Sequence, residues 1–228
     1  MTQRIKNNSK LWVIVAAAGV GARFGSVLPK QYAVMSNQKT ILDTTLSALL
    51  QHSAIGNIML VLHPDDQQWP QSEFYQSERI QTTVGATLRA QSVLNGVLAL
   101  NNTLADNDWV LTHDVCRPYV SHQHPNQLLT LIDSDHPVGG LLAVPLTDTI
   151  KQVDHNSCVI KTVPRDHLWR AQTPQLFRYG LLKKALQAAF AADFIVTDES
   201  SAIEFLGLQP VVIQDSTRNI KITYAEDL

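Results

Sequence analysis

The sequence predicts an α/β fold in which helices cover both faces of a mostly parallel, doubly wound, Rossmann-like sheet. Short and nearly continuous apolar runs, typical of strands buried on both faces, alternate along the chain with amphipathic segments of helical spacing. One pair of strand-like runs near residue 155 has no helix between them and predicts an inserted β-hairpin. Because ligands bind such sheets beyond the carboxyl ends of the strands, we expect the polar motifs that follow the strands to meet at one edge.

In the first half of the chain, strands and helices are expected in alternation. Apolar runs predict strands at residues 11–15, 57–62, 80–84 and 109–112. Apolar residues at helical spacing predict helices at 41–51, 87–100 and 125–133. Thr40 is placed to cap the first of these helices. Residues 66–79 are polar and turn-like and predict no regular element.

In the second half, a buried strand is expected at 139–144, and the hairpin follows it. The two runs of the hairpin, 149–153 and 158–163, are joined by the turn-rich sequence Asp-His-Asn-Ser. A hairpin that stands alone is marginally stable, so we expect residues 147–163 to protrude and to pack against a second subunit. Two helices are then expected at 180–192 and 197–206, the second ending at Gly207, and two strands at 210–213 and 219–223.

Composition and charge are those of an ordinary globular protein. Of the 228 residues, 45% are hydrophobic and 17% are charged, and no Pro/Gly/Ser-rich linker divides them, so a single domain over residues 1–228 is expected. The formal charge of −2 predicts no basic surface and argues against nucleic acid as a partner. Cys116 and Cys158 are far apart, which argues for a reducing compartment rather than a disulfide framework.

The N-terminal region imitates a secretory signal, because Arg4, Lys6 and Lys10 precede an apolar stretch that ends in three alanines. Cleavage there would remove the first strand and leave the following glycine-rich loop without support. We therefore favour a short polar leader. No other apolar run approaches the ~20 residues that span a bilayer, so we expect a cytoplasmic protein with no membrane partner.

The loop after the first strand, residues 16–25, contains closely spaced glycines, and the cations Arg23 and Lys30 follow on the same loop. Glycines let the backbone approach a ligand, and exposed N–H groups and cations bind phosphate oxygens. The dinucleotide fingerprint Gly-x-Gly-x-x-Gly fails, since Phe24 occupies its third glycine position, and the Gly-Lys-Ser/Thr phosphate loop is absent. A plain tight turn remains the alternative, but the two cations favour triphosphate binding.

Asp114 follows the strand at 109–112. A single carboxylate that faces phosphates suits Mg²⁺, because this ion keeps several waters and takes one or two protein carboxylates. The alternatives are a helix cap or an ion pair with Arg117. The neighbouring His113 and Cys116 are interpreted as structural, because no further His or Cys lies near enough in the sequence to suggest a metal cluster or a nucleophile–base pair.

Lys221 is expected within the strand at 219–223, where its neighbours are apolar. A charge in such a place is costly unless it meets an anion. A functional role is therefore favoured for Lys221.

Eight short motifs follow one another along the chain from about Leu11 to its end. They read Ala-Ala-Gly-x-Gly-x-Arg-Phe, Pro-Lys-Gln-Tyr, Arg-x-x-Ser-Val, His-Asp-x-x-Arg-Pro, Asp-Thr-Ile-Lys, Gln-Thr-Pro-Gln, Thr-Asp-Glu and Asn-Ile-Lys-Ile-Thr. In this combination the sequence closely resembles the family of 2-C-methyl-D-erythritol 4-phosphate cytidylyltransferases, enzymes of the non-mevalonate isoprenoid pathway. The order of the motifs is far more specific than any one of them. The resemblance implies a nucleotidyltransferase sheet.

The resemblance also implies a role for each motif. Main-chain groups, together with the Ser92 side chain, would bind the cytosine and ribose of CTP; they belong to Ala16, Ala17, Ala18, Gly19, Gly21, Gly85 and Ala86. Arg23 and Lys30 would hold the triphosphate, and Asp114 would bind Mg²⁺. Arg117, Thr173, Thr197, Lys221 and Asp114 would surround the sugar phosphate. Thr149 and Arg165 would come from the hairpin of a partner subunit in a homodimer.

The implied reaction is transfer of CMP from CTP to the sugar-alcohol phosphate, with Arg23, Lys30, Arg165 and Lys221 as catalytic cations. A ribitol 5-phosphate cytidylyltransferase shares several of these motifs and is the first alternative. The segment 168–174, Leu-Trp-Arg-Ala-Gln-Thr-Pro, looks more like the methylerythritol branch. A nucleotide-binding module without catalysis is the second alternative. The family commonly has glycine where Ala86 stands and often an acidic residue where Thr87 stands.

Overall fold

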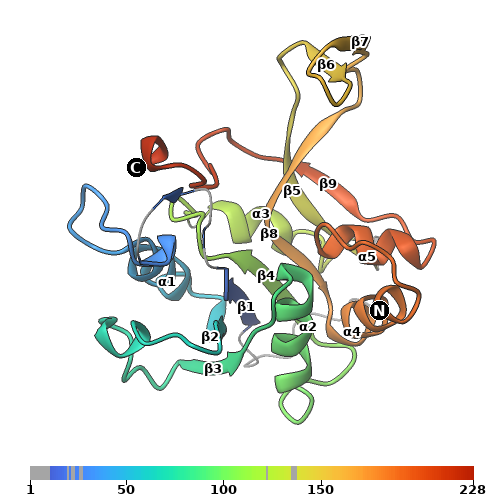
Figure 1. The fold of residues 1–228 in the computed structure, drawn as a ribbon. Coiled ribbons are helices and arrows are strands. Elements are labelled where there is room, and N and C mark those ends of the chain that lie inside the picture. Colours follow the sequence, from blue (N-terminus) through green and yellow to red (C-terminus); the bar gives the residue numbers. More distant parts are fainter. Residues whose placement is uncertain (1–10, 20, 22–23, 26–27, 122, 135–137) are drawn as a thin grey trace.

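The computed structural model describes residues 11–228 except 20, 22–23, 26–27, 122 and 135–137. Within these residues, seven strands form one sheet in the order β3-β2-β1-β4-β8-β5-β9, and β6 and β7 form a separate two-stranded sheet (Figure 1). The strands are β1 (Leu11–Ala17), β2 (Ile55–Leu62), β3 (Ile80–Val84), β4 (Trp109–Asp114), β5 (Gly139–Pro145), β6 (Ile150–Val153), β7 (Val159–Val163), β8 (Trp169–Arg178) and β9 (Val211–Gln214). The helices are α1 (Ile41–Leu50), α2 (Arg89–Ala99), α3 (Gln123–Leu129), α4 (Tyr179–Ala191) and α5 (Glu199–Phe205).

The large sheet is mostly parallel, as expected. Its strands pair in parallel except β8, which is antiparallel to both of its neighbours, β4 and β5. The strands expected before residue 145 and the expected helices are present within a few residues of their expected ends. Thr40 caps α1 through a hydrogen bond that its hydroxyl accepts from the N–H of Asp43. The predicted α/β fold class is confirmed.

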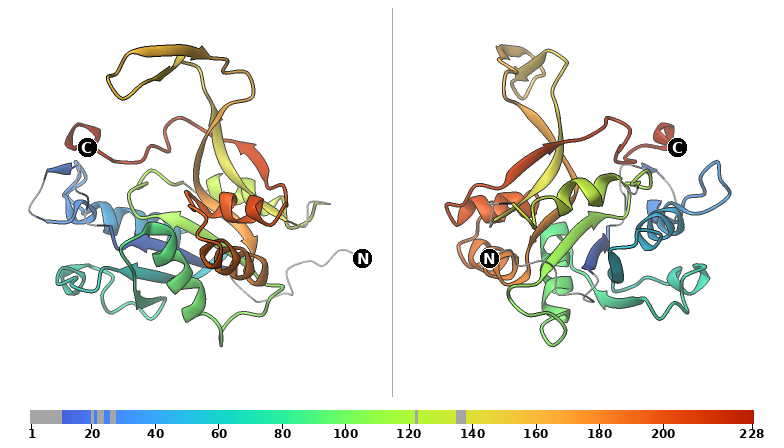
Figure 2. Two further views of the ribbon diagram at one scale, coloured as in Figure 1. Left: turned by 45° about the vertical axis from the view of Figure 1, so that its right-hand side comes forward. Right: turned by 180° about the vertical axis from the view of Figure 1, so that it is seen from behind.

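Helices cover both faces of the sheet (Figure 2). Successive residues of β1 point to opposite faces: Val13 packs with residues of α1 and α3, whereas Ile14 packs with residues of α2, α4 and α5. Both side chains are fully buried, which explains why this strand is apolar at every position. In the described ranges, none of the helices is both long enough and apolar enough to cross a membrane.

Strand β8 was not expected. Its sequence is polar in the middle and contains Pro174, which cannot donate to a neighbouring strand, so it does not have the pattern of a central strand. The structure accommodates the proline at an irregularity: the pairing of β8 with β5 shifts between Leu141 and Ala143, and its pairing with β4 reaches only to Gln175. Strand β8, in the interior of the sheet, therefore carries polar side chains beside the carboxyl end of β4.

The prediction of a strand at 219–223 is wrong. These residues form an irregular segment without strand pairing. Its hydrogen bonds reach the residues just after β4: the N–H of Ile222 donates to the carbonyl of Cys116 at 2.8 Å, and the guanidinium of Arg117 donates to the carbonyl of Asn219 at 2.6 Å. Lys221 is accordingly a partly exposed side chain, not a buried one.

The expected hairpin is present as β6 and β7, and it projects from the sheet on an arm formed by the ends of β5 and β8 (Figures 1 and 2). Asp154 shapes its turn, because its carboxylate accepts hydrogen bonds from the N–H groups of Asn156 and Cys158. Apolar side chains of the hairpin are open to solvent: Val159 is 61% exposed and Ile160 is 59% exposed.

Candidate active site

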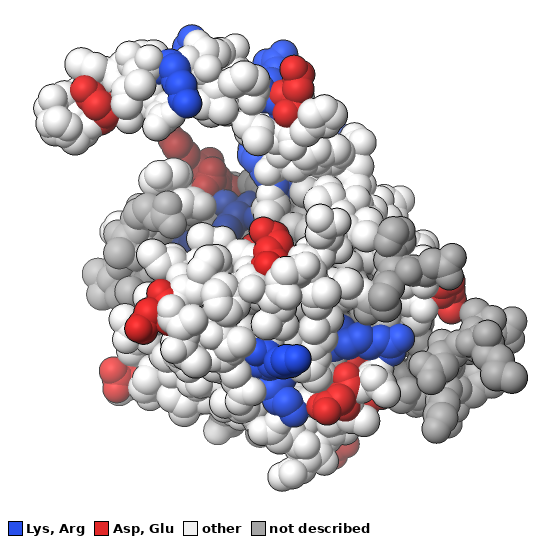
Figure 3. All heavy atoms as spheres, turned by 90° about the vertical axis from the view of Figure 1, so that its right-hand side faces the viewer, with Lys and Arg blue, Asp and Glu red and all other residues white. Residues whose placement is uncertain are grey.

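A cavity of about 340 Å³ lies at the carboxyl ends of β1 and β4. The two strands are in register there, since Ala16 of β1 pairs with Asp114 of β4. The residues expected at the site that line this cavity are Ala16, Ala18, Gly19, Gly21, Lys30, Ala86, Ser92, Asp114 and Lys221. On one face of the molecule the surface is hollowed beneath the hairpin arm, and both basic and acidic side chains lie in the hollow (Figure 3).

Gly21 and Lys30 are in contact on the loop that follows β1. Gly21 has a φ of +67°, in the left-handed region that favours glycine, and a Cβ added there would lie 2.9 Å from the Cγ of Lys30. Glycine is thus required both by the backbone and by the lysine stem packed against it. The Lys30 ammonium group donates to the carbonyl of Ile222 at 2.9 Å. Arg23, expected beside Lys30, lies outside the described residues.

Hydrogen bonds of the two residues after Lys30 fix the position of its side chain. Residues Lys30–Tyr32 form a short 3₁₀ turn. The side-chain amide of Gln31 donates to the carbonyl of Ala17 at 2.9 Å, and the Tyr32 hydroxyl donates to the carboxylate of Asp66 at 2.8 Å. Because both neighbours are anchored in the protein, the turn holds Lys30 at the cavity.

The loop between β3 and α2 forms a second wall. A Cβ on Gly85 would lie 2.4 Å from the Cβ of Ala18, so only glycine lets this loop approach the end of β1 so closely. The buried Ser92 hydroxyl accepts a hydrogen bond from the N–H of Ala86 at 2.9 Å and lies 3.0 Å from the carbonyl of the same residue. Ser92 therefore shapes the loop whose main chain faces the cavity.

Asp114, at the end of β4, is surrounded by cations. Its Oδ1 lies 2.6 Å from Nε of Arg89, and its Oδ2 lies 2.8 Å from Nζ of Lys221 and 3.7 Å from Nε of Arg117. Burial by itself would raise the pKa of this carboxyl group, but the three cations outweigh burial and hold the pKa well below its usual range. The carboxylate is therefore ionised at neutral pH. The ion pair with Arg117, one of the alternatives for Asp114, is only one of its three contacts.

Arg89 and Glu199 are parts of the site that the sequence analysis missed. Both oxygens of Glu199, a fully buried carboxylate, accept hydrogen bonds from Arg89, at 2.8 and 3.2 Å. The hydroxyl of Thr112 donates to the same carboxylate at 2.8 Å. The motifs Arg-x-x-Ser-Val and Thr-Asp-Glu contain the two residues, but no local pattern indicates that side chains so far apart in the sequence meet.

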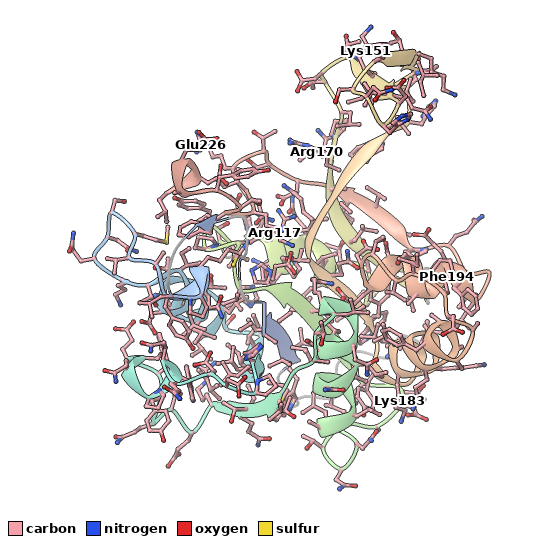
Figure 4. The ribbon with its side chains drawn as sticks, viewed as in Figure 1. Arg117, Lys151, Arg170, Lys183, Phe194 and Glu226 are labelled. Atoms are coloured by element: carbon pink, nitrogen blue, oxygen red, sulfur yellow. The ribbon has the colours of Figure 1, made fainter. Side chains whose placement is uncertain are left out.

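Thr173 and Arg117 support the end of β4. The N–H of Asp114 donates to the hydroxyl of Thr173 at 3.0 Å, and this hydroxyl also lies 3.1 Å from Nδ1 of His113. His113 is fully buried, and burial lowers its pKa to about 3, so its imidazole is neutral and structural. Arg117 lies between the end of β4 and the hairpin arm, whereas Lys151 lies near the far end of the arm (Figure 4).

Of the other expected residues, Ala17, Gly85, Arg117 and Thr173 adjoin or contact lining residues without lining the cavity, and Thr149, Arg165 and Thr197 do not line it either. Thr149 immediately precedes β6 and Arg165 follows β7, so both lie on the arm, where the guanidinium of Arg165 donates to the carbonyl of Thr147. Thr197 lies two residues before α5 and its N–H donates to the hydroxyl of Ser201 at 3.1 Å. Neither arm residue lines the cavity described above.

Comparison with known proteins agrees with this arrangement. A family model described as IspD, 2-C-methyl-D-erythritol 4-phosphate cytidylyltransferase, matches residues 11–228. The chain belongs to this cytidylyltransferase family. The predicted resemblance is therefore confirmed.

Relatives that carry the family name cover nearly the whole chain. The cytidylyltransferases of Pseudomonas putida (strain GB-1) and Pseudomonas fluorescens (strain SBW25) are 43% and 44% identical over 218 residues, which is 95% of this chain and 92% of each relative. The crystal structure of the Francisella tularensis cytidylyltransferase superposes with a TM-score of 0.84 at 38% identity, over 96% of both chains. A crystal structure titled 4-diphosphocytidyl-2C-methyl-D-erythritol synthase superposes with a TM-score of 0.81 at 34% identity.

Proposed function

We propose that this protein transfers CMP from CTP to 2-C-methyl-D-erythritol 4-phosphate and releases pyrophosphate. Both reactants are anionic, and the cavity brings Lys30 and Lys221 together beside a single carboxylate, Asp114. This arrangement carries the proposal, because positioning and charge neutralisation supply most of the catalysis in phosphoryl-type transfers. The free cysteines, Cys116 and Cys158, support a reducing, cytoplasmic location.

The mechanism requires no strong general base. A phosphate oxygen of the acceptor, already an anion, attacks the α-phosphorus of CTP in line; the new P–O bond forms while the bond to the β-phosphate oxygen breaks, and pyrophosphate leaves toward the glycine-rich loop. The titratable groups beside Asp114 are unsuited to proton abstraction. Burial leaves His113 weakly basic, with a pKa of about 3, and raises the pKa of the Cys116 thiol to about 11.

We assign roles to polar groups that line the cavity and to expected residues outside it. Lys30, together with Arg23, binds the triphosphate and stabilises the charge that develops at the α-phosphorus, and Lys221 neutralises charge between the two reactants. The acceptor phosphate is bound by Arg117, Thr173 and Thr197, with Asp114 and Lys221 beside them. The cytosine and ribose face main-chain groups of residues 16–19, Gly21, Gly85 and Ala86, in a loop that Ser92 shapes.

The residues present fit a magnesium ion at Asp114. Asp114 is the one carboxylate among the described residues that line the cavity. One carboxylate suffices for Mg²⁺, which takes its other ligands from water and from nucleotide phosphates. When bound, the ion would neutralise the triphosphate and polarise its oxygens.

We propose further that the site is completed in a homodimer by the arm of a second subunit, which contributes Thr149 and Arg165. The arm projects from the body, and its apolar side chains Val153, Val159 and Ile160 are exposed. Exposed apolar surface of this kind is typical of an interface. Neither Thr149 nor Arg165 lines the cavity of its own chain.

Subunit complementation tests the dimer. The Arg165→Ala and Lys30→Ala proteins should each be nearly inactive, whereas a heterodimer of the two should recover about half of the wild-type turnover, because one of its two symmetric sites has neither substitution. Turnover of differently tagged, co-expressed and purified heterodimers measures this. Lys161→Ala, an exposed cation of β7, is the control and should be fully active. A heterodimer as inactive as its parents would place Arg165 in the site of its own chain.

Pyrophosphate release tests the activity itself. With CTP and Mg²⁺, release should occur only after 2-C-methyl-D-erythritol 4-phosphate is added, and ribitol 5-phosphate should support it poorly. A preference for ribitol 5-phosphate would favour the other cytidylyltransferase reaction. Tight binding of CTP without release in the presence of either acceptor would indicate a nucleotide-binding module.

A further inference from the structure

The partly buried Arg89 and the fully buried Glu199 form an ion pair beside Asp114. Two N–H groups of the Arg89 guanidinium donate to the two oxygens of Glu199, and its Nε–H donates to Oδ1 of Asp114 at 2.6 Å. The guanidinium is a rigid plane, so the two bonds to Glu199 determine where Nε points. Glu199 is itself held by the hydroxyl of Thr112. Three hydrogen bonds to two carboxylates therefore hold the Arg89 side chain in place.

The two oxygens of Asp114 have unlike partners. Oδ1 is bonded to Arg89, which cannot leave without exposing the buried charge of Glu199 to an apolar interior, a change that is strongly destabilising. Oδ2 is bonded to Lys221, whose side chain is 39% exposed and lies on a segment outside the sheet. Nε of Arg117 also faces Oδ2, but at 3.7 Å it lies beyond hydrogen-bond distance. An exposed lysine exchanges partners at little cost. Of the two oxygens, only Oδ2 is readily released to a ligand.

We propose that Arg89, anchored by Glu199, is a positioning residue that holds Oδ1 of Asp114 and leaves Oδ2 as the single oxygen available to the divalent cation, with Lys221 occupying Oδ2 until the cation and nucleotide arrive. The inference rests on the proposed function, because it concerns the same metal site. After it leaves Oδ2, Lys221 can pair with the phosphates of the incoming nucleotide and acceptor, which are also anions.

The competing explanations predict different results. If Arg89 only competes with the metal for a shared carboxylate, its removal strengthens metal binding. If Arg89 and Glu199 only connect α2 with α5, their removal lowers stability and leaves metal binding unchanged. If Arg89 positions Asp114, its removal weakens metal binding in a protein that is still folded, because the carboxylate is then free to rotate.

The test is the affinity for CTP measured by calorimetry with Mg²⁺ and, separately, with EDTA. The ratio of the two dissociation constants reports the contribution of the metal and does not depend on turnover. In the Arg89→Met/Glu199→Met protein, which removes the pair without leaving a buried charge, this ratio should fall at least about tenfold. A ratio that is unchanged or larger overturns the role of Arg89.

Arg89→Lys keeps the proposal testable if the double substitution does not fold. Lysine keeps the charge but cannot bond Glu199 and Asp114 at once as the planar guanidinium does. The ratio of the two CTP dissociation constants should therefore stay below its wild-type value. A wild-type ratio would show that charge alone matters and would overturn the proposal. Arg79→Met is the matched control. Arg79 donates to the carbonyls of Leu50, Ile55 and Gly56 at the opposite edge of the sheet, so its loss should lower stability and leave the ratio unchanged.

The wild-type protein separates this inference from the function on which it rests. If Mg²⁺ does not tighten CTP binding to the wild type, the metal site of the proposed function fails, and the inference fails with it. If Mg²⁺ does so equally in the wild type and in the double variant, only the role of Arg89 fails. A metal effect in the wild type that is lost in both Arg89 variants supports both.

Discussion

Replacing Lys30 with alanine is expected to lower turnover by about 10²-fold or more, the scale that follows the loss of one donor to a transition state. The side chain lies at the cavity, with its stem against Gly21 and its ammonium group 2.9 Å from the carbonyl of Ile222. Charge develops on the α-phosphorus oxygens during transfer, and a preorganised cation stabilises it without reorganisation. Steady-state kcat and KM for both substrates measure the effect, which should fall mainly on kcat.

Lys39→Ala is the matched control for Lys30→Ala. Lys39 forms an ion pair with Glu73 at 2.7 Å, but both side chains are 44% exposed, and pairs of this kind contribute little to stability. The Lys39→Ala protein should have wild-type turnover. If Lys30→Ala retained most of its turnover, the loop after β1 would not be the site of phosphate transfer.

The strands that build the cavity could be predicted because each is a short apolar run. Strand β8 could not, because its polar residues make contacts that no local pattern reveals. The amide of Gln175 donates to Asp198 at the start of α5 at 2.9 Å, and that of Gln172 donates to the carbonyl of Asn219 at 3.2 Å. Both contacts position segments that carry site residues. The strand departs from the usual alternation because it organises the site as well as the core.

The functional role predicted for Lys221 was based on a strand that the structure does not contain. A strand was expected around it because its neighbours are apolar, yet these residues form an irregular segment that is hydrogen-bonded to the residues just after β4. The argument from the cost of burying a cation does not apply, since the Lys221 side chain is 39% exposed. The anion that Lys221 meets in this structure is the carboxylate of Asp114, at 2.8 Å, a partner more than a hundred residues earlier that no spacing in the sequence identifies.

Asp114→Asn is expected to lower turnover by about 10²-fold or more and also to destabilise the fold. The asparagine amide is a poor ligand for Mg²⁺, so added metal should not restore turnover. The substitution also leaves Arg89 and its neighbours without the anion that they surround. Removing one member of a buried ion pair costs about 3 kcal/mol or more, and the Asp114 side chain is only 8% exposed.

The pH dependence of this loss of stability follows from the direction of the pKa shift. The cations around Asp114 hold its pKa in the folded protein below the value of about 3.9 for an unperturbed aspartate. A group with a depressed pKa stabilises the folded state fully above its unfolded pKa, and this contribution is lost as the pH falls through the lower folded value. Urea unfolding of the wild type and of Asp114→Asn should therefore give a constant difference in free energy of unfolding between pH 8 and pH 5, which narrows only in more acidic solution. A difference that already shrinks between pH 8 and pH 5 would mean that the carboxyl group is not held ionised by Arg89, Lys221 and Arg117, and the electrostatic basis of the site would be wrong.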